Sequence, residues 1–252
     1  MSGTRLIHPV VIFASVLGLL VVAGCATKPG KGFSAIQETL YLAAAAAEQE
    51  NDYESAIGYY QKLVLENPDK EDVVLALSRN LRYSGDSQNA VLVLEQADFG
   101  DDGEPAFLLE YAKAIIAAGK PRIAIKNLKA AQEKYPENWE VYSLLGIAYD
   151  LTEDYGEARK VYEKAGMLSE DNPAILNNRA ISLALSGDLD GAIAMLNSNP
   201  RLARSSSQIR QNLAFFYGIK GDIDSAEALA RMDLDEETIQ RNLLIYSQFR
   251  QD

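Results

Sequence analysis

The stretch Leu145-Gly146-Ile147-Ala148-Tyr149 is followed, at helical spacing, by Tyr155, Ala158, Tyr162 and Ala165. A large residue, a small one and a tyrosine, then a turn and a second segment with alanine and an aromatic residue, predict two antiparallel helices in close contact. Gly146 and Ala158 are the small residues that permit the close approach, and Tyr149 and Tyr162 fill the space beside them. The stretch therefore predicts a helix-turn-helix packing unit.

The same unit recurs along the chain at a spacing of 34 residues. The small residue of the second helix falls on Ala56, Ala90, Ala124, Ala158, Ala192 and Ala226. The small residue of the first helix falls on Ala44, Ser78, Ala112, Gly146, Ala180 and Ala214, and the turn between the helices on Asn51, Gly85, Gly119, Glu153, Gly187 and Gly221. Glycine and asparagine suit the left-handed backbone that commonly ends a helix.

This pattern resembles the tetratricopeptide repeat (TPR). It predicts an all-α TPR superhelix, an α-solenoid, of six helix-turn-helix repeats over residues 35–234, with repeat windows beginning at 37, 71, 105, 139, 173 and 207. A further amphipathic segment, residues 235–252, begins at Asp235 as a helix N-cap and has Ile239, Leu243, Tyr246 and Phe249 on one face. Because stacked repeats need a cap over the last apolar face, we expect this segment to be a C-terminal capping helix.

The amino terminus is predicted to lie outside the repeats. After Arg5 comes an apolar run from Val10 to Val22, too short for a comfortable transmembrane helix, and then Ala23-Gly24-Cys25. The small residues before cysteine resemble the lipobox of bacterial lipoproteins. That resemblance implies a signal peptide over residues 1–24 and an N-acyl diacylglycerol modification at Cys25. The glycines and the proline of Lys28-Pro29-Gly30-Lys31-Gly32 predict a flexible tether over residues 25–34. An ordinary signal peptide with an incidental cysteine is the alternative.

The residue following the modified cysteine bears on localisation. Alanine, not aspartate, follows Cys25. By resemblance to lipoprotein sorting in Gram-negative bacteria, this predicts an outer-membrane protein anchored by its lipid on the periplasmic face.

Composition narrows the classes of function. The 252-residue chain is 48% hydrophobic and 24% charged, a globular balance, and its net charge of −12 makes nucleic acid an unsuitable partner. Its single His, His8, lies in the predicted signal peptide, and its single Cys is expected to be acylated. The usual nucleophile and metal-ligand sets are therefore missing from the processed chain. We expect no enzyme activity, no metal, no cofactor beyond the lipid and no small-molecule substrate.

One acidic segment interrupts the repeats, at residues 99–104. A hinge or a weak Ca²⁺ site is conceivable, but the acids do not alternate as an oxygen-ligand loop requires. We interpret the segment as a solvated turn.

Recognition of a protein partner is predicted on the first helices, which mainly form the inner surface of a TPR stack. In the last three repeats the ninth and thirteenth positions form an apolar stripe bordered by amides. The predicted protein-binding residues are Ile147, Leu151, Asn177, Asn178, Ile181, Leu185, Gln211, Asn212, Phe215 and Ile219. An exposed apolar band of this length would mark a binding surface. The alternative is that these side chains pack against the neighbouring repeat and that the amides form a solvated rim.

The last repeat carries a more specific signature. It reads Ile209-Arg210-Gln211-Asn212-Leu213-Ala214, then Gly221, then Ser225-Ala226-Glu227-Ala228-Leu229-Ala230-Arg231, with Asp233-Leu234 and Asn242-Leu243 after it. This resembles the carboxyl-terminal signature of the TPR lipoprotein of tight-adherence (Tad, or Flp pilus) secretion systems, the TadD family. The resemblance implies a non-catalytic, pilotin-like scaffold that binds the outer-membrane secretin or another Tad pilus protein. The alternative function is a periplasmic adaptor that tethers peptidoglycan hydrolases or a protease.

Overall fold

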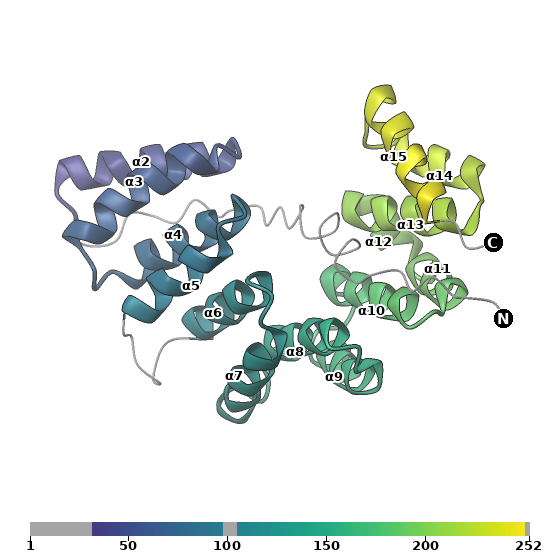
Figure 1. The fold of residues 1–252 in the computed structure, drawn as a ribbon, viewed down its shortest axis with the longest axis horizontal. Helices are drawn as coiled ribbons and strands as arrows, with labels where there is room; N and C mark the ends of the chain where they lie inside the picture. Colours follow the sequence, from purple (N-terminus) through teal and green to yellow (C-terminus); the bar gives the residue numbers. More distant parts are fainter. Residues whose placement is uncertain (1–31, 98–104, 250–252) are drawn as a thin grey trace. The chain divides into compact units, whose positions relative to one another are not determined.

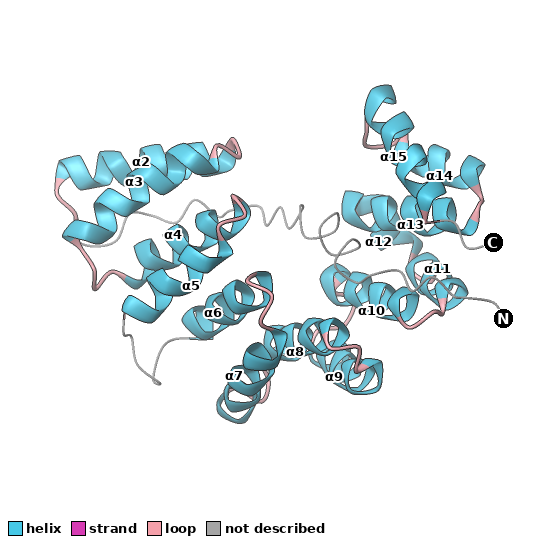
Figure 2. Cartoon of the chain, in the orientation of Figure 1, coloured by secondary structure: helices cyan, strands magenta, loops and turns pink. Residues whose placement is uncertain are grey.

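The structure is a computed structural model, and it describes residues 32–97 and 105–249. Within these residues every regular element is an α-helix (Figures 1 and 2). The predicted signal peptide, Cys25 and the acidic segment 99–104 lie outside the described residues. The chain divides after Pro136 into two compact units. We call the described residues 32–97 and 105–136 the N-terminal unit and residues 137–249 the C-terminal unit.

The N-terminal unit consists of three helix pairs in chain order. Its helices are α2 (Ala35–Gln49) with α3 (Tyr53–Glu66), α4 (Glu71–Tyr83) with α5 (Ser87–Gln96), and α6 (Pro105–Ala117) with α7 (Pro121–Lys134). In each pair the two helices pack against one another.

The C-terminal unit contains three further pairs and two additional helices. The pairs are α8 (Trp139–Leu151) with α9 (Tyr155–Leu168), α10 (Pro173–Leu185) with α11 (Leu189–Asn197), and α13 (Ser207–Lys220) with α14 (Ile223–Ala230). A short helix α12 (Pro200–Ser205) precedes α13, and α15 (Glu236–Gln248) follows α14. First helices therefore begin at residues 71, 105, 139, 173 and 207, where the repeat windows begin.

The small residues at the repeated positions are buried, as their spacing predicts. All six alanines of the second helices, from Ala56 to Ala226, are 0% exposed. Their counterparts on the first helices are buried as well. At Gly146 even a methyl group is excluded, because a Cβ there would overlap the ring of Tyr162. Each pair is therefore held together at a contact that only small side chains permit.

The turns within the pairs share one backbone conformation. All six have a positive φ, from 59° at Asn51 to 93° at Gly187. Glu153, with φ 61°, is the only one of the six that is neither glycine nor asparagine. Left-handed backbone is costly for such a side chain, so the position is set by the packing of α8 and α9 on either side.

The end of the chain forms the predicted additional helix. Asp235 is the N-cap of α15 and accepts a hydrogen bond from the backbone N–H of Thr238 at 2.8 Å. Ile239 and Tyr246 are buried against the last pair. Tyr246 covers Gly218 of α13, where a Cβ would overlap its ring. The all-α fold of repeated helix pairs predicted from the sequence is thus confirmed.

Candidate protein-binding face

In the C-terminal unit, each of the first helices α8, α10 and α13 is preceded by a residue whose side chain caps its first turn. Asn138 and Asn172 accept hydrogen bonds from the backbone N–H groups of Glu140 (2.9 Å) and Ala174 (3.0 Å). Ser206 caps α13 in the same way. These caps satisfy backbone donors that a helix start leaves unpaired, and they fix where each first helix begins.

Polar side chains connect each first helix to the next. Asn178 of α10 donates to the hydroxyl of Ser143 on α8 at 3.1 Å. One repeat later, Asn212 of α13 donates to the side-chain carbonyl of Asn177 on α10. Asn177 and Asn212 are buried, so the hydrogen bond between them offsets part of the cost of burying both amides. Amide hydrogen bonds therefore join α8 to α10 and α10 to α13.

A buried carboxyl group also lies between these helices. Asp150 of α8 is 0% exposed and accepts hydrogen bonds from Ser182 of α10 at 2.6 Å and from Tyr162 of α9 at 2.9 Å. Burial raises the pKa of Asp150 to about 7, although the two hydrogen bonds favour the charged form. The same burial, beside this carboxyl group, raises the pKa of Tyr162. Asp150 thus joins three helices but is largely removed from solvent.

The structure places the ten predicted binding residues in two groups. Six are half-buried, with part of each side chain at the surface: Ile147, Leu151, Asn178, Leu185, Gln211 and Phe215. Four are buried: Asn177, Ile181, Asn212 and Ile219. The first group can contact a partner directly, whereas the second forms the floor beneath it.

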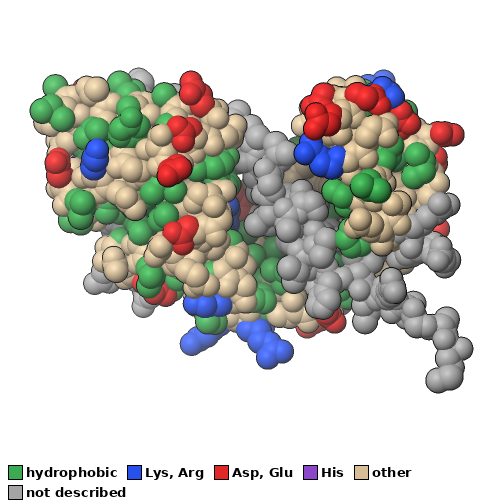
Figure 3. Space-filling model, turned by 45° about the horizontal axis from the view of Figure 1, so that its top comes forward, with side chains coloured by type: hydrophobic (Ala, Val, Ile, Leu, Met, Phe, Trp, Pro, Cys, Tyr) green, Lys and Arg blue, Asp and Glu red, His purple; other side chains and the backbone are tan. Residues whose placement is uncertain are grey.

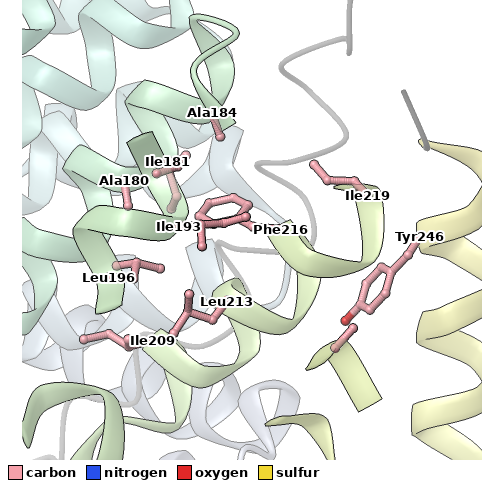
Figure 4. Packing of buried hydrophobic residues seen from close by; sticks show 12 residues of the cluster. Ala180, Ile181, Ala184, Ile193, Leu196, Ile209, Leu213, Phe216, Ile219 and Tyr246 are labelled. Atoms are coloured by element: carbon pink, nitrogen blue, oxygen red, sulfur yellow. The ribbon is translucent and has the colours of Figure 1, made fainter. Parts of the chain in front are cut away.

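The buried isoleucines belong to a hydrophobic cluster. Ile181 and Ile219 are 5% and 1% exposed and pack among residues of α10, α11, α13 and α15. Figure 4 shows Ile181 beside Ile193 and Phe216, with Ile219 at the far end of α13. Their side chains stabilise the stack, which is the packing role that the sequence left open for them.

Phe215 connects the predicted stripe to α15. Its ring lies 5.4 Å from that of Tyr246, edge to face, and 6.5 Å from that of Phe249. Aromatic pairs in this geometry contribute beyond their buried area. The capping helix therefore contacts the first-helix side of the last repeat as well as its end.

The first helices of the N-terminal unit are joined by different contacts. There, ion pairs join the first helices: Arg79 with Glu48 at 2.6 Å, and Arg82 with Glu110 at 3.0 Å. Arg82 and Glu110 are only 8% and 10% exposed, and the Arg82 guanidinium also lies over the ring of Tyr83. Charged side chains therefore join the first helices of the N-terminal unit, whereas amides and hydroxyl groups join those of the C-terminal unit. Figure 3 shows acidic, basic and apolar side chains interspersed over the face in view.

The residues of the carboxyl-terminal signature contact one another. The guanidinium of Arg210 binds both carboxylate oxygens of Asp233, with one distance of 2.7 Å, and donates to the carbonyl oxygen of Ala203 at 3.1 Å. Arg210 and Asp233 are 11% and 13% exposed. The signature therefore defines a clamp between the start of α13 and the segment after α14, a pairing over 23 residues that helical periodicity does not reveal.

A metal centre is not among the candidate sites of the described residues. No group of three or more His, Cys, Asp or Glu side chains in these residues is arranged to hold a metal ion.

No helix in the described part of the chain is long and apolar enough to cross a membrane.

Comparison with known proteins agrees with this geometry. Two families described as tetratricopeptide repeats match residues 112–171 and 38–70. A TPR repeat-containing thioredoxin of Arabidopsis thaliana, TTL4, is 37% identical over 73 residues, which is 29% of this chain and 11% of TTL4. The chain thus spans about a tenth of the length of that relative.

Solved structures share the fold at low sequence identity. A thermophilic TPR protein of Thermus thermophilus is 21% identical with a TM-score of 0.62, covering 71% of this chain and 99% of that one. PilW, a type IV pilus biogenesis factor, is 16% identical with a TM-score of 0.63, covering 84% and 100%. PilF of Pseudomonas aeruginosa is 16% identical with a TM-score of 0.55, covering 81% and 95%. Parts of the chain therefore match tetratricopeptide repeats, and its fold is that of an all-α TPR superhelix.

Proposed function

We propose that this protein is a lipid-anchored, non-catalytic scaffold that assists assembly of a Tad-type pilus secretion machinery by binding its secretin or another pilus component. The observation that carries the proposal is the half-buried apolar and amide surface on α8, α10 and α13, because it offers contacts for a protein segment and no constellation for catalysis. The carboxyl-terminal signature supports the choice of the Tad system. The choice is compatible with the fact that two pilus factors, PilW and PilF, have the same fold.

The proposed location rests on the amino terminus. Acylation of Cys25 would hold the repeats at the periplasmic face of the outer membrane, since several acyl chains on one residue anchor a protein firmly. Cys25→Ser is expected to move the protein from the membrane fraction to the soluble periplasmic fraction, with an unchanged far-UV circular dichroism spectrum. A variant that stays with the membrane would remove the lipid anchor from the proposal.

The partner is tested in the native envelope. Crosslinking in intact cells, followed by purification of the full chain in detergent and mass spectrometry, is expected to recover a secretin or another Tad protein. Leu151→Asp is expected to reduce that recovery, because a carboxylate would be buried in the contact. The matched control is Met167→Asp, on the exposed side of α9, where the side chain is 75% exposed. Recovery of peptidoglycan hydrolases in place of pilus proteins would replace the pilus role with the hydrolase-adaptor role.

A further inference from the structure

Helix α15 has the register of a fourth first helix. Each first helix of the C-terminal unit has two buried residues seven positions apart that face its neighbours. These pairs are Val141 with Ala148, Ile175 with Ser182, Ile209 with Phe216 and, in α15, Ile239 with Tyr246. α15 packs against α13, as α13 packs against α10 and α10 against α8. The capping helix therefore continues the row of first helices.

This register extends the apolar stripe by two residues. We call two sets of residues the apolar rows. The first row consists of the residue directly before the second buried residue of each helix: Ile147 in α8, Ile181 in α10, Phe215 in α13 and Ile245 in α15. The second row lies one turn further along the same face, four residues later in each case, and consists of Leu151, Leu185, Ile219 and Phe249. All eight are apolar. Ile245 is 41% exposed. The sequence pattern did not identify it, because the helical period places Ile239, Leu243, Tyr246 and Phe249 on the apolar side of α15 and leaves Ile245 outside that set.

The two rows are also uncharged, although 24% of the whole chain is Asp, Glu, Lys or Arg. The acid nearest to them in sequence, Asp150, is 0% exposed and hydrogen-bonded to two hydroxyl groups. A charged side chain of a partner would lose its hydration over these rows. The charged group nearest to Ile245 along its face of α15 is Arg241, one turn earlier, at the edge of the rows. The surface is therefore matched to an uncharged partner.

The dimensions indicate the form of the partner. The rows are two residues wide, and two of their four middle members, Ile181 and Ile219, are almost fully buried. That leaves far less apolar area than the roughly 800 Å² per partner that a stable dimer buries. Four helices packed about 8–10 Å apart span about 30 Å, which suits a single segment lying across them.

We infer that α8, α10, α13 and α15 together bind one uncharged, apolar segment of a partner protein, and that Ile245 forms part of this site. The inference rests on the proposed scaffold function and specifies the chemistry of what the scaffold holds.

The probe is a displayed library of random peptides of about 20 residues, the length at which even a helix spans 30 Å. The target is the full chain, purified in detergent. Selected peptides are expected to be rich in Leu, Ile, Val and Phe over a core without Asp, Glu, Lys or Arg. Ile245→Asp is expected to weaken their binding about tenfold or more, because a carboxylate would enter an apolar contact.

Two exposed apolar residues supply matched controls. Leu244 is adjacent to Ile245 on α15 and is 65% exposed, and Met167 lies on α9 and is 75% exposed. Leu244→Asp and Met167→Asp are each expected to change peptide binding by less than about twofold. All three side chains are already at least 41% exposed, so circular dichroism should show each variant folded.

Several outcomes would overturn the inference. They are selection of acidic or basic peptides, selection of none, equal losses in Ile245→Asp and Leu244→Asp, or self-association of the chain that Ile245→Asp abolishes. The last result would mean that a second copy occupies the face. The envelope crosslinking described above tests the scaffold function independently of the peptide selection. Recovery of pilus proteins together with a failed peptide selection would therefore reject this binding site but leave the proposed scaffold function in place.

Discussion

Two acids at equivalent positions, the partly exposed Glu48 and the buried Asp150, have different partners in the two units. Glu48 of α2 pairs with Arg79 and also accepts a hydrogen bond from Tyr60 at 3.3 Å. Asp150 of α8 accepts one from Tyr162 in the corresponding place of the fourth repeat, but its second partner is the Ser182 hydroxyl. Without a cation to favour the charged form, burial dominates and raises the pKa of Asp150 to about 7.

Asp150→Asn is expected to remove a pH dependence from stability. Because the folded pKa of Asp150 lies above the unfolded value, its contribution is fully present below about pH 4 and is lost as the pH rises to about 7. The loss is on the order of 4 kcal/mol at most. The single Trp of the chain, Trp139, lies at the start of α8 and reports unfolding of this unit by fluorescence. The melting temperature of the variant relative to the native chain should rise from pH 5 to pH 8. A difference independent of pH would contradict the assignment.

Gly146→Ala is expected to destabilise the chain by about 1–3 kcal/mol, although alanine is the better helix former. The reason is the ring of Tyr162, which a Cβ would overlap. In a chain that also carries Tyr162→Leu, the cost of Gly146→Ala should fall below about 0.5 kcal/mol, because leucine fills the corresponding place at Leu128 and Leu196 opposite alanine. Denaturant unfolding of the four chains measures this coupling, and an unchanged cost would show that the clash is relieved elsewhere.

At the scale of elements, sequence periodicity predicted the helix pairs well because it reports local packing. Alanine at a fixed spacing located all six pairs, and Asp235 located the start of α15. The short helix α12 was not predicted, since Asn199-Pro200 reads as a break. Here Pro200 occupies the first turn and Asn199 caps it, an arrangement that a single sequence does not separate from a loop.

The clamp between Arg210 and Asp233 is expected to hold the segment before α15. Arg210→Ala leaves the largely buried Asp233 without its cation and should cost about 1–3 kcal/mol. Hydrogen exchange should accelerate in α15 and in the preceding turn. The matched control is Arg231→Ala, whose ion pairs with Glu227 and Glu236 are more exposed and should change the free energy of unfolding much less. Equal effects of the two substitutions would show that the clamp has no special role.

At the scale of the whole molecule, the sequence predicted an apolar stripe but not which of its side chains are accessible. The apolar stripe was visible as a periodic pattern, but the burial of Ile181 and Ile219 depends on α11 and α15, which pack from further along the chain. The same dependence concealed the alignment of Ile245 with the earlier repeats. Periodicity defines a face of one helix, whereas burial is decided by the neighbours.

Binding of a partner segment is expected to be insensitive to salt, in spite of the net charge of −12. The two apolar rows carry no charge, so screening has no direct ion pair to weaken. The dissociation constant of a selected peptide should change by less than about twofold between about 50 mM and about 500 mM NaCl. A loss of affinity with added salt would assign recognition to the charged first helices of the N-terminal unit instead.

The spacing of the first helices also constrains the sequence of whatever binds them. The distance of about 8–10 Å between neighbouring helices matches one turn of polyproline II, three residues at about 3.1 Å each, and is slightly shorter than seven residues of α-helix at about 1.5 Å each. A segment that places one side chain over each of α8, α10, α13 and α15 would therefore carry large apolar residues at every third or every seventh position. Such a period can be sought in the sequences of candidate pilus proteins before any binding is measured.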